Sequence, residues 1–99
     1  MASSKEYRDF VLEQASELNL TYKPMMSEYL LYFDGIYFGG VFDDRLLVKI
    51  TPNGAKYGMR EQLPYDGAKP MYFVEEIDDR ALVCDIIRTV SADLKKKAK

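Results

Sequence analysis

Apolar residues near the start of the chain recur at the spacing of a helix. The mostly apolar stripe consists of Tyr7, Phe10, Val11, Gln14, Ala15 and Leu18. Ser3 and Glu6 have the spacing of a capping box, so the pattern predicts a helix that begins after Ser3 and ends near Asn19. Pro24 disfavours helical backbone in the residue before it, and residues 23–26 are therefore expected to lead into a strand.

A second long helix is predicted at the end of the chain. Its apolar side consists of Leu82, Val83, Ile86, Ile87, Val90 and Leu94. Asp78 is the expected N-cap, with Ile77 and Leu82 at the two positions of a hydrophobic staple. The basic run at residues 95–99 suits the negative end of the helix dipole.

The segment between these helices begins with a predicted β-hairpin. Asp34-Gly35 lies between two apolar runs, which is typical of a two-residue type I′ turn. Phe33 would then face Ile36, Leu31 would face Phe38 and Tyr29 would face Gly40, and these pairs form the expected core face. Tyr32 opposite Tyr37 and Leu30 opposite Gly39 would form the second face.

A further turn is predicted at residues 43–45. A two-residue loop would place Lys49 in the core, where an unpaired charge is costly. We therefore expect a three-residue loop, which sets Phe42 opposite Leu46 and leaves Lys49 opposite Gly39 on the second face. On this register the third strand places three residues on the core face: Leu46, Val48 and Ile50.

The remaining elements are shorter. Thr51-Pro52 suits an N-cap followed by proline at the first position of a short helix. Residues 63–68 are rich in turn formers and could include a short edge strand, and residues 71–74 form a predicted strand. Together these elements predict one α+β domain over residues 1–99, with an antiparallel sheet and helices at both ends.

The second sheet face is unusually apolar for a surface. Its residues are Leu30, Tyr32, Tyr37 and Lys49. Two long helices can cover only one face of a sheet cheaply, so two interpretations remain. Another helix covers this face, as two-layer domains require, or the face is a dimer or partner interface, where tyrosine is enriched.

Few residues in the chain suit catalysis or metal binding. The chain has no histidine and one cysteine, Cys84, which excludes triads that depend on histidine, an internal disulfide and multi-cysteine zinc sites. Cys84 lies at the edge of a helical stripe and is expected to be structural, while its use as a nucleophile would require rapid alkylation at neutral pH. The acidic doublets at residues 43–44, 75–76 and 78–79 lack the spacing of a calcium loop. We expect a non-enzymatic protein with no cofactor and no metal.

Charge and composition limit the kinds of partner. The net charge of −2 argues against nucleic-acid binding through the overall field of the protein. The single cysteine and the apolar runs, which are too short to span a membrane, favour a cytoplasmic protein. The aromatic and glycine-rich residues 31–42 do not fit an RNA-recognition motif, because the residue before Gly35 is acidic. A candidate basic patch nevertheless remains: Arg45, Lys49, Lys56, Arg60 and Lys69. Direct nucleic-acid binding through this patch is the alternative hypothesis.

The order of residues resembles the N-terminal domain of the TfoX/Sxy family of competence regulators. The resemblance is carried by YKPMMSEYLLYFDGIYFGGVFDDRLLVKIT and LPYDGAKPMYFVEEIDD, and it covers about residues 4–94. It implies an α-β(3)-α-β(2)-α two-layer fold, similar to that of type III secretion chaperones. Dimerisation and protein binding are expected by analogy. The second, C-terminal domain of full-length relatives is not expected in this sequence.

The leading hypothesis is a small protein–protein interaction module, dimeric or bound to another protein. A part in transcriptional regulation, as regulator or co-regulator, is implied by the resemblance. The predicted partner or dimer surface is the set Leu30, Tyr32, Tyr37 and Lys49.

Overall fold

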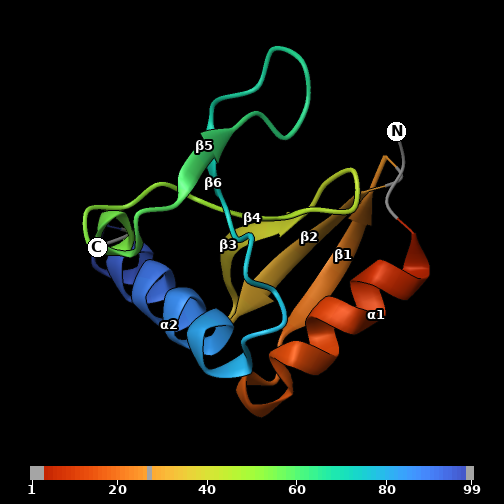
Figure 1. Cartoon of the computed structure of the whole chain (residues 1–99), viewed down its shortest axis with the longest axis horizontal. Helices are drawn as coiled ribbons and strands as arrows, with labels where there is room; N and C mark the ends of the chain where they lie inside the picture. The colour runs from red at the N-terminus through yellow and green to blue at the C-terminus, as the bar shows by residue number, and fades with distance from the viewer. Residues whose placement is uncertain (1–3, 27, 98–99) are drawn as a thin grey trace.

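The computed structural model describes residues 4–26 and 28–97. The described elements form a six-stranded antiparallel sheet in the order β1-β2-β3-β4-β6-β5, with one long helix from each end of the chain (Figure 1). Their bounds are α1 Lys5–Gln14, η1 Ser16–Leu18, β1 Thr21–Met25, β2 Glu28–Phe33, β3 Ile36–Val41, β4 Leu46–Val48, η2 Gly54–Tyr57, β5 Arg60–Gln62, β6 Met71–Phe73 and α2 Arg80–Lys97. The predicted α+β class, with an antiparallel sheet and terminal helices, is confirmed.

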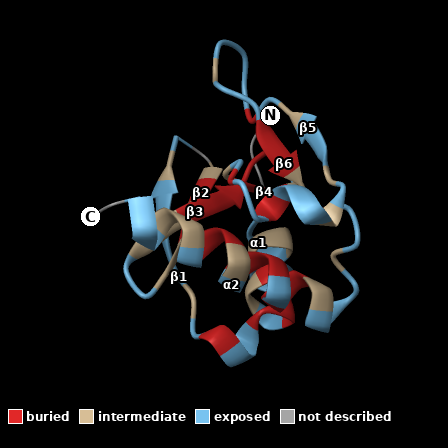
Figure 2. Cartoon of the chain, turned by 90° about the vertical axis from the view of Figure 1, so that its left-hand side faces the viewer, coloured by how far each residue is buried: buried red, intermediate tan, exposed pale blue. Residues whose placement is uncertain are grey.

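Both helices lie on the same side of the sheet (Figures 1 and 2). The main core contains residues of α1, α2 and one face of the strands: Val11, Ala15, Tyr29, Leu31, Phe38, Val41, Leu46, Val48, Val83, Ile86, Ile87 and Val90, among others. The apolar residues of the two predicted stripes lie in or against this core, except Phe10, which is 37% exposed and was wrongly placed on the buried side. Burial of these stripes, rather than helix propensity, supplies most of the stability of such helices.

The helix caps differ from the prediction by one residue. The Ser4 hydroxyl accepts a hydrogen bond from the Tyr7 amide (3.0 Å) and caps α1, whereas the predicted cap Ser3 lies outside the described residues. At α2 the carboxylate of Asp79 accepts from the Leu82 amide (3.1 Å), so Asp78 is not the cap. A turn closed by the Glu76 carbonyl and the Asp79 amide delays the helix by one residue.

The end of the first helical segment is close to the prediction. The α-helix stops at Gln14, a 3₁₀ turn continues to Leu18, and Asn19 adopts a left-handed backbone with φ of +53°. This conformation suits asparagine and ends the segment.

Strand β1 is an addition to the predicted sheet. It pairs antiparallel with β2 at the sheet edge, where Pro24 is tolerated because an edge strand can lack one amide donor. The Arg8 guanidinium of α1 lies 4.7 Å from the ring centre of Tyr22 and 5.0 Å from that of Tyr29. These cation–π contacts connect β1 and β2 to the helix layer.

The first hairpin has the predicted turn but not the predicted register. Asp34 and Gly35 have φ of +52° and +76°, as a type I′ turn requires, and Phe33–Ile36 and Tyr32–Tyr37 pair as expected. A register shift follows, and Phe38 becomes an extra residue on β3. The predicted pairs Leu31–Phe38, Leu30–Gly39 and Tyr29–Gly40 are therefore wrong, and the observed pairs are Leu31–Gly39, Leu30–Gly40 and Tyr29–Val41.

The second hairpin uses the shorter loop. Asp43 and Asp44 both have positive φ (+52° and +54°), and Phe42 and Arg45 exchange two backbone hydrogen bonds. The predicted three-residue loop is wrong, because the predicted register of β3 lacks the bulge at Phe38. The bulge moves the outer half of β3 by one residue, so a two-residue loop still leaves Lys49 outside the core.

This shift changes which residues lie in the core. Val41 faces Leu46 in the main core, whereas Phe42, predicted to face Leu46, packs on the other side of the sheet. The Lys49 amide donates to the Phe38 carbonyl (2.8 Å), so Lys49 is not opposite Gly39. Ile50, predicted to be buried, is 42% exposed.

The short elements that follow agree in part with the prediction. The Thr51 hydroxyl accepts from the Gly54 amide, and the expected short helix is the 3₁₀ turn η2. The edge strand predicted within residues 63–68 instead lies just before them as β5. It pairs with β6 in a register that sets Arg60 opposite Phe73. Strand β6 confirms the strand predicted at residues 71–74.

Candidate functional site

The sheet face opposite the helices carries its own apolar cluster. Phe42, Leu47 and Met71 are buried there, with Leu30 and Phe73 packed against them. Neither described helix contributes a residue to this cluster. The alternation of side chains along β3, β4 and β6 sends one set to the helices and the other to this face.

The loop between β5 and β6 partly covers this face. It extends away from the helix layer at the top of Figure 1. Tyr65 of this loop lies 6.4 Å from Phe42, measured between ring centres. Pro64 and Gly67, which has φ of +84°, favour turns rather than a strand in this segment.

Between the loop and the sheet lies an apolar groove of about 570 Å³. Its aliphatic and aromatic lining includes Leu30, Tyr37, Phe42, Tyr65 and Met71. The charged lining residues are Lys49 and Lys69, and none of the described lining residues is acidic. The groove therefore combines an apolar floor with positive charge.

The predicted partner surface is brought together by the structure. Leu30, Tyr37 and Lys49 line the groove, and Tyr32 lies beside it with its ring centre 5.7 Å from that of Tyr37. The Lys49 ammonium lies 4.4 Å from the Tyr37 ring centre, a cation–π contact that orients the lysine. Burial raises the pKa of the Tyr37 phenol, so its hydroxyl stays protonated at neutral pH.

Sequence reasoning missed part of this groove. The predicted register places Phe42 in the core, because no sequence signal marks the bulge at Phe38. Tyr65 and Met71 were not connected to the tyrosine face, because their approach depends on the path of the β5–β6 loop. An aromatic residue beside Pro64 in a turn-rich segment is at most a weak sign of such packing.

The predicted basic patch is divided among several environments. Lys49 and Lys69 line the groove. The Arg45 guanidinium donates to the Gln62 side chain and to backbone carbonyls, and Arg60 forms an ion pair with Glu75. Lys56 lies on η2, with its ammonium 5.3 Å from the ring centre of Tyr57. Two of the five residues thus share one site.

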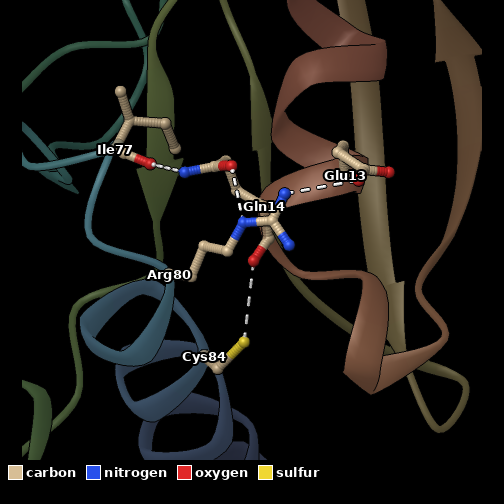
Figure 3. Close-up of polar contacts among 5 residues, drawn as sticks. All are labelled: Glu13, Gln14, Ile77, Arg80 and Cys84. Carbon is tan, nitrogen blue, oxygen red and sulfur yellow. Dashed lines mark hydrogen bonds and ion pairs between the residues drawn. The ribbon is translucent and has the colours of Figure 1, made fainter.

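Cys84 belongs to a structural cluster between the two helices (Figure 3). Its thiol donates to the Gln14 carbonyl (3.8 Å), while the Gln14 side chain donates to the Ile77 carbonyl and accepts from Arg80. Burial raises the pKa of the Cys84 thiol, and the Glu17 carboxylate adds to this shift. A protonated, 2% exposed thiol is a poor nucleophile.

The described residues also limit other kinds of site. Within residues 4–26 and 28–97, no group of three or more acidic, cysteine or histidine side chains could hold a metal ion. The same part of the chain contains no helix that is both long and apolar enough to cross a membrane.

The fold and the groove define a class: a two-layer α+β protein with its helices on one sheet face and an apolar groove on the other. The chain is 32% identical over 98 residues to the "Uncharacterized 12.7 kDa protein in trpE 5'region" of Spirochaeta aurantia, covering 95% of this chain and 85% of that protein. The chain belongs to the same family as this protein. No family model matches the sequence, and no solved structure matches it.

Proposed function

We propose that the protein is a non-enzymatic protein-interaction module and that the groove is its binding surface. The carrying observation is the apolar sheet face that neither described helix covers, with Leu30, Phe42 and Met71 beneath exposed Tyr65. Apolar patches rimmed by polar residues are typical of protein-binding surfaces. Tyrosine and methionine are also enriched in such interfaces.

The resemblance to the TfoX N-terminal domain extends this proposal to regulation. Under it, the module acts in transcriptional regulation by binding another protein or a second copy of itself, as a regulator or co-regulator. The fold alone does not carry this part of the proposal, because one fold can serve many functions.

A photo-crosslinking comparison tests the binding surface. A benzophenone amino acid replaces Tyr65, which is 56% exposed beside the groove, or Phe10, which is 37% exposed on α1. Both are exposed aromatic positions, so the second protein is a control that carries the same probe on the helix layer. After irradiation in an extract of the source cells, we expect protein adducts several-fold more abundant from the Tyr65 position.

The other outcomes separate the hypotheses. Equal adduct yields from the two positions, or none from Tyr65, contradict the proposed surface. Adducts that disappear after nuclease treatment would support nucleic-acid binding through residues such as Lys49 and Lys69 and would overturn the protein-interaction proposal.

A further inference from the structure

We infer that the groove binds a segment of a different protein in which acidic side chains flank apolar ones. This inference rests on the proposed function and specifies the chemistry of the partner. The charged side chains that line the groove are both positive.

The two lysines of the groove come from separate parts of the chain. Lys49 follows β4, and Lys69 belongs to the loop before β6. No acidic residue stands among the described lining residues, although the whole chain has a net charge of −2. None of the ion pairs within residues 4–26 and 28–97 involves either lysine.

These charges select the partner by complementarity. An acidic side chain on a bound segment would approach Lys49 or Lys69 while neighbouring apolar side chains enter the groove between Tyr37 and Met71. Such pairing favours acidic segments over basic ones, since like charges at the same edge repel. A volume of about 570 Å³ suits several side chains of one segment.

A second copy of this chain fits the groove less well. In a two-fold contact the same surface meets itself, so groove residues of one copy meet groove residues of the other. Lys49 and Lys69 would then approach two further lysines, with no acidic lining residue of the described chain to compensate. The charge of the groove thus favours a different protein.

Selection from a library of short random peptides displayed on phage tests this inference. The baits are the unmodified protein, the Lys49→Glu/Lys69→Glu variant and a Lys96→Glu/Lys97→Glu control. The control makes the same change in net charge at the exposed end of α2. Circular dichroism and thermal unfolding check that each bait is folded, and Lys69→Glu alone keeps the Lys49–Tyr37 contact intact.

The unmodified protein and the control should enrich peptides that combine aspartate or glutamate with leucine or aromatic residues. Their affinity, measured by fluorescence anisotropy, should fall about tenfold or more in the Lys49→Glu/Lys69→Glu variant and by a smaller factor in Lys69→Glu. It should change less than about twofold in the control.

Three results would overturn the inference. In the first, the enriched peptides compete with one another for the groove but lack an acidic excess and bind equally to the charge-reversed variant. This result would overturn the inferred acidic partner and leave the proposed function standing. No enrichment that depends on the groove would count against both. A dimer detected by light scattering and dissociated by the groove variant would identify a second copy as the occupant.

Discussion

Gly39 and Gly40 lie where β3 approaches its two neighbouring strands too closely for a side chain. A Cβ atom on Gly39 would stand 2.1 Å from the Leu47 carbonyl oxygen and 2.8 Å from the Val48 Cα. On Gly40 it would stand 2.3 Å from the Tyr29 carbonyl oxygen. Because these obstacles are backbone atoms, they cannot move aside as a flexible side chain could. Glycine at these two positions is thus required by packing beside the bulge.

Substitution of Gly39 therefore tests the bulged register. Gly39→Ala should lower the free energy of unfolding by about 3 kcal/mol or more, since the strands must separate to admit the methyl group. Gly35→Ala is the matched control: it faces open space but has φ of +76°, and it should cost only about 1 kcal/mol. Urea unfolding measures both values, and equal losses would contradict the close approach at Gly39.

The environment of Cys84 leads to a second prediction at this scale. Burial and a raised pKa keep the thiol protonated and enclosed, so iodoacetamide at pH 8 should react slowly with the folded protein. The rate should rise on the order of a hundredfold in denaturing urea, where the thiol is exposed. Mass spectrometry follows the reaction, and a comparable rate in the folded protein would indicate an activated cysteine.

At the scale of elements, periodicity predicted the two helices, the first hairpin turn and strand β6. These depend on local patterns: apolar stripes, Asp34-Gly35 and a β-branched and aromatic run. The register between strands was not predictable, because Phe38 carries no signal that it is the extra residue of a bulge. Because of that single residue, Phe42 lines the groove and not the predicted core, whereas Leu30, Tyr37 and Lys49 of the predicted second face do line the groove.

A carboxylate of α2 binds the residue at the start of η2, in addition to the contacts of the Tyr57 hydroxyl with Asp85 and Thr89. Asp93 accepts hydrogen bonds from the backbone amide and the side-chain amide of Asn53 (2.8 and 2.6 Å). These bonds hold the pKa of Asp93 below its ordinary value of 3.8. A lowered pKa contributes stability that is present above pH 3.8 and is lost as the pH falls through the lower folded-state pKa.

Asp93→Asn should therefore destabilise the protein at neutral pH but matter less in acid. We expect the difference in urea midpoint between the two proteins at pH 7 to shrink as the pH falls below 3.8. Lys97→Gln, one turn further along α2, removes a charge that is not among the groups lowering the pKa of Asp93 and is a control for general loss of charge near the site. A difference that stays constant with pH would show that the ionised form of Asp93 has no special part.

At the scale of the whole molecule, the two sheet faces differ in what packs against them. One face packs against α1 and α2 and forms the main core (Figures 1 and 2). The other face and the β5–β6 loop line the groove. The apolar character of the second face could be recognised from Leu30, Tyr32 and Tyr37. Its shape and charge could not, because Lys69 and Tyr65 approach only through the folded loop.

The most direct test is an amide NMR titration of the protein with the most enriched acidic and apolar peptide. We expect the largest chemical-shift changes at Tyr37, Lys49 and Met71, around the groove, with smaller changes on α1 and α2. Largest changes on the helix layer, or a spectrum that the peptide leaves unaltered, would contradict the claim that the open sheet face is the binding surface.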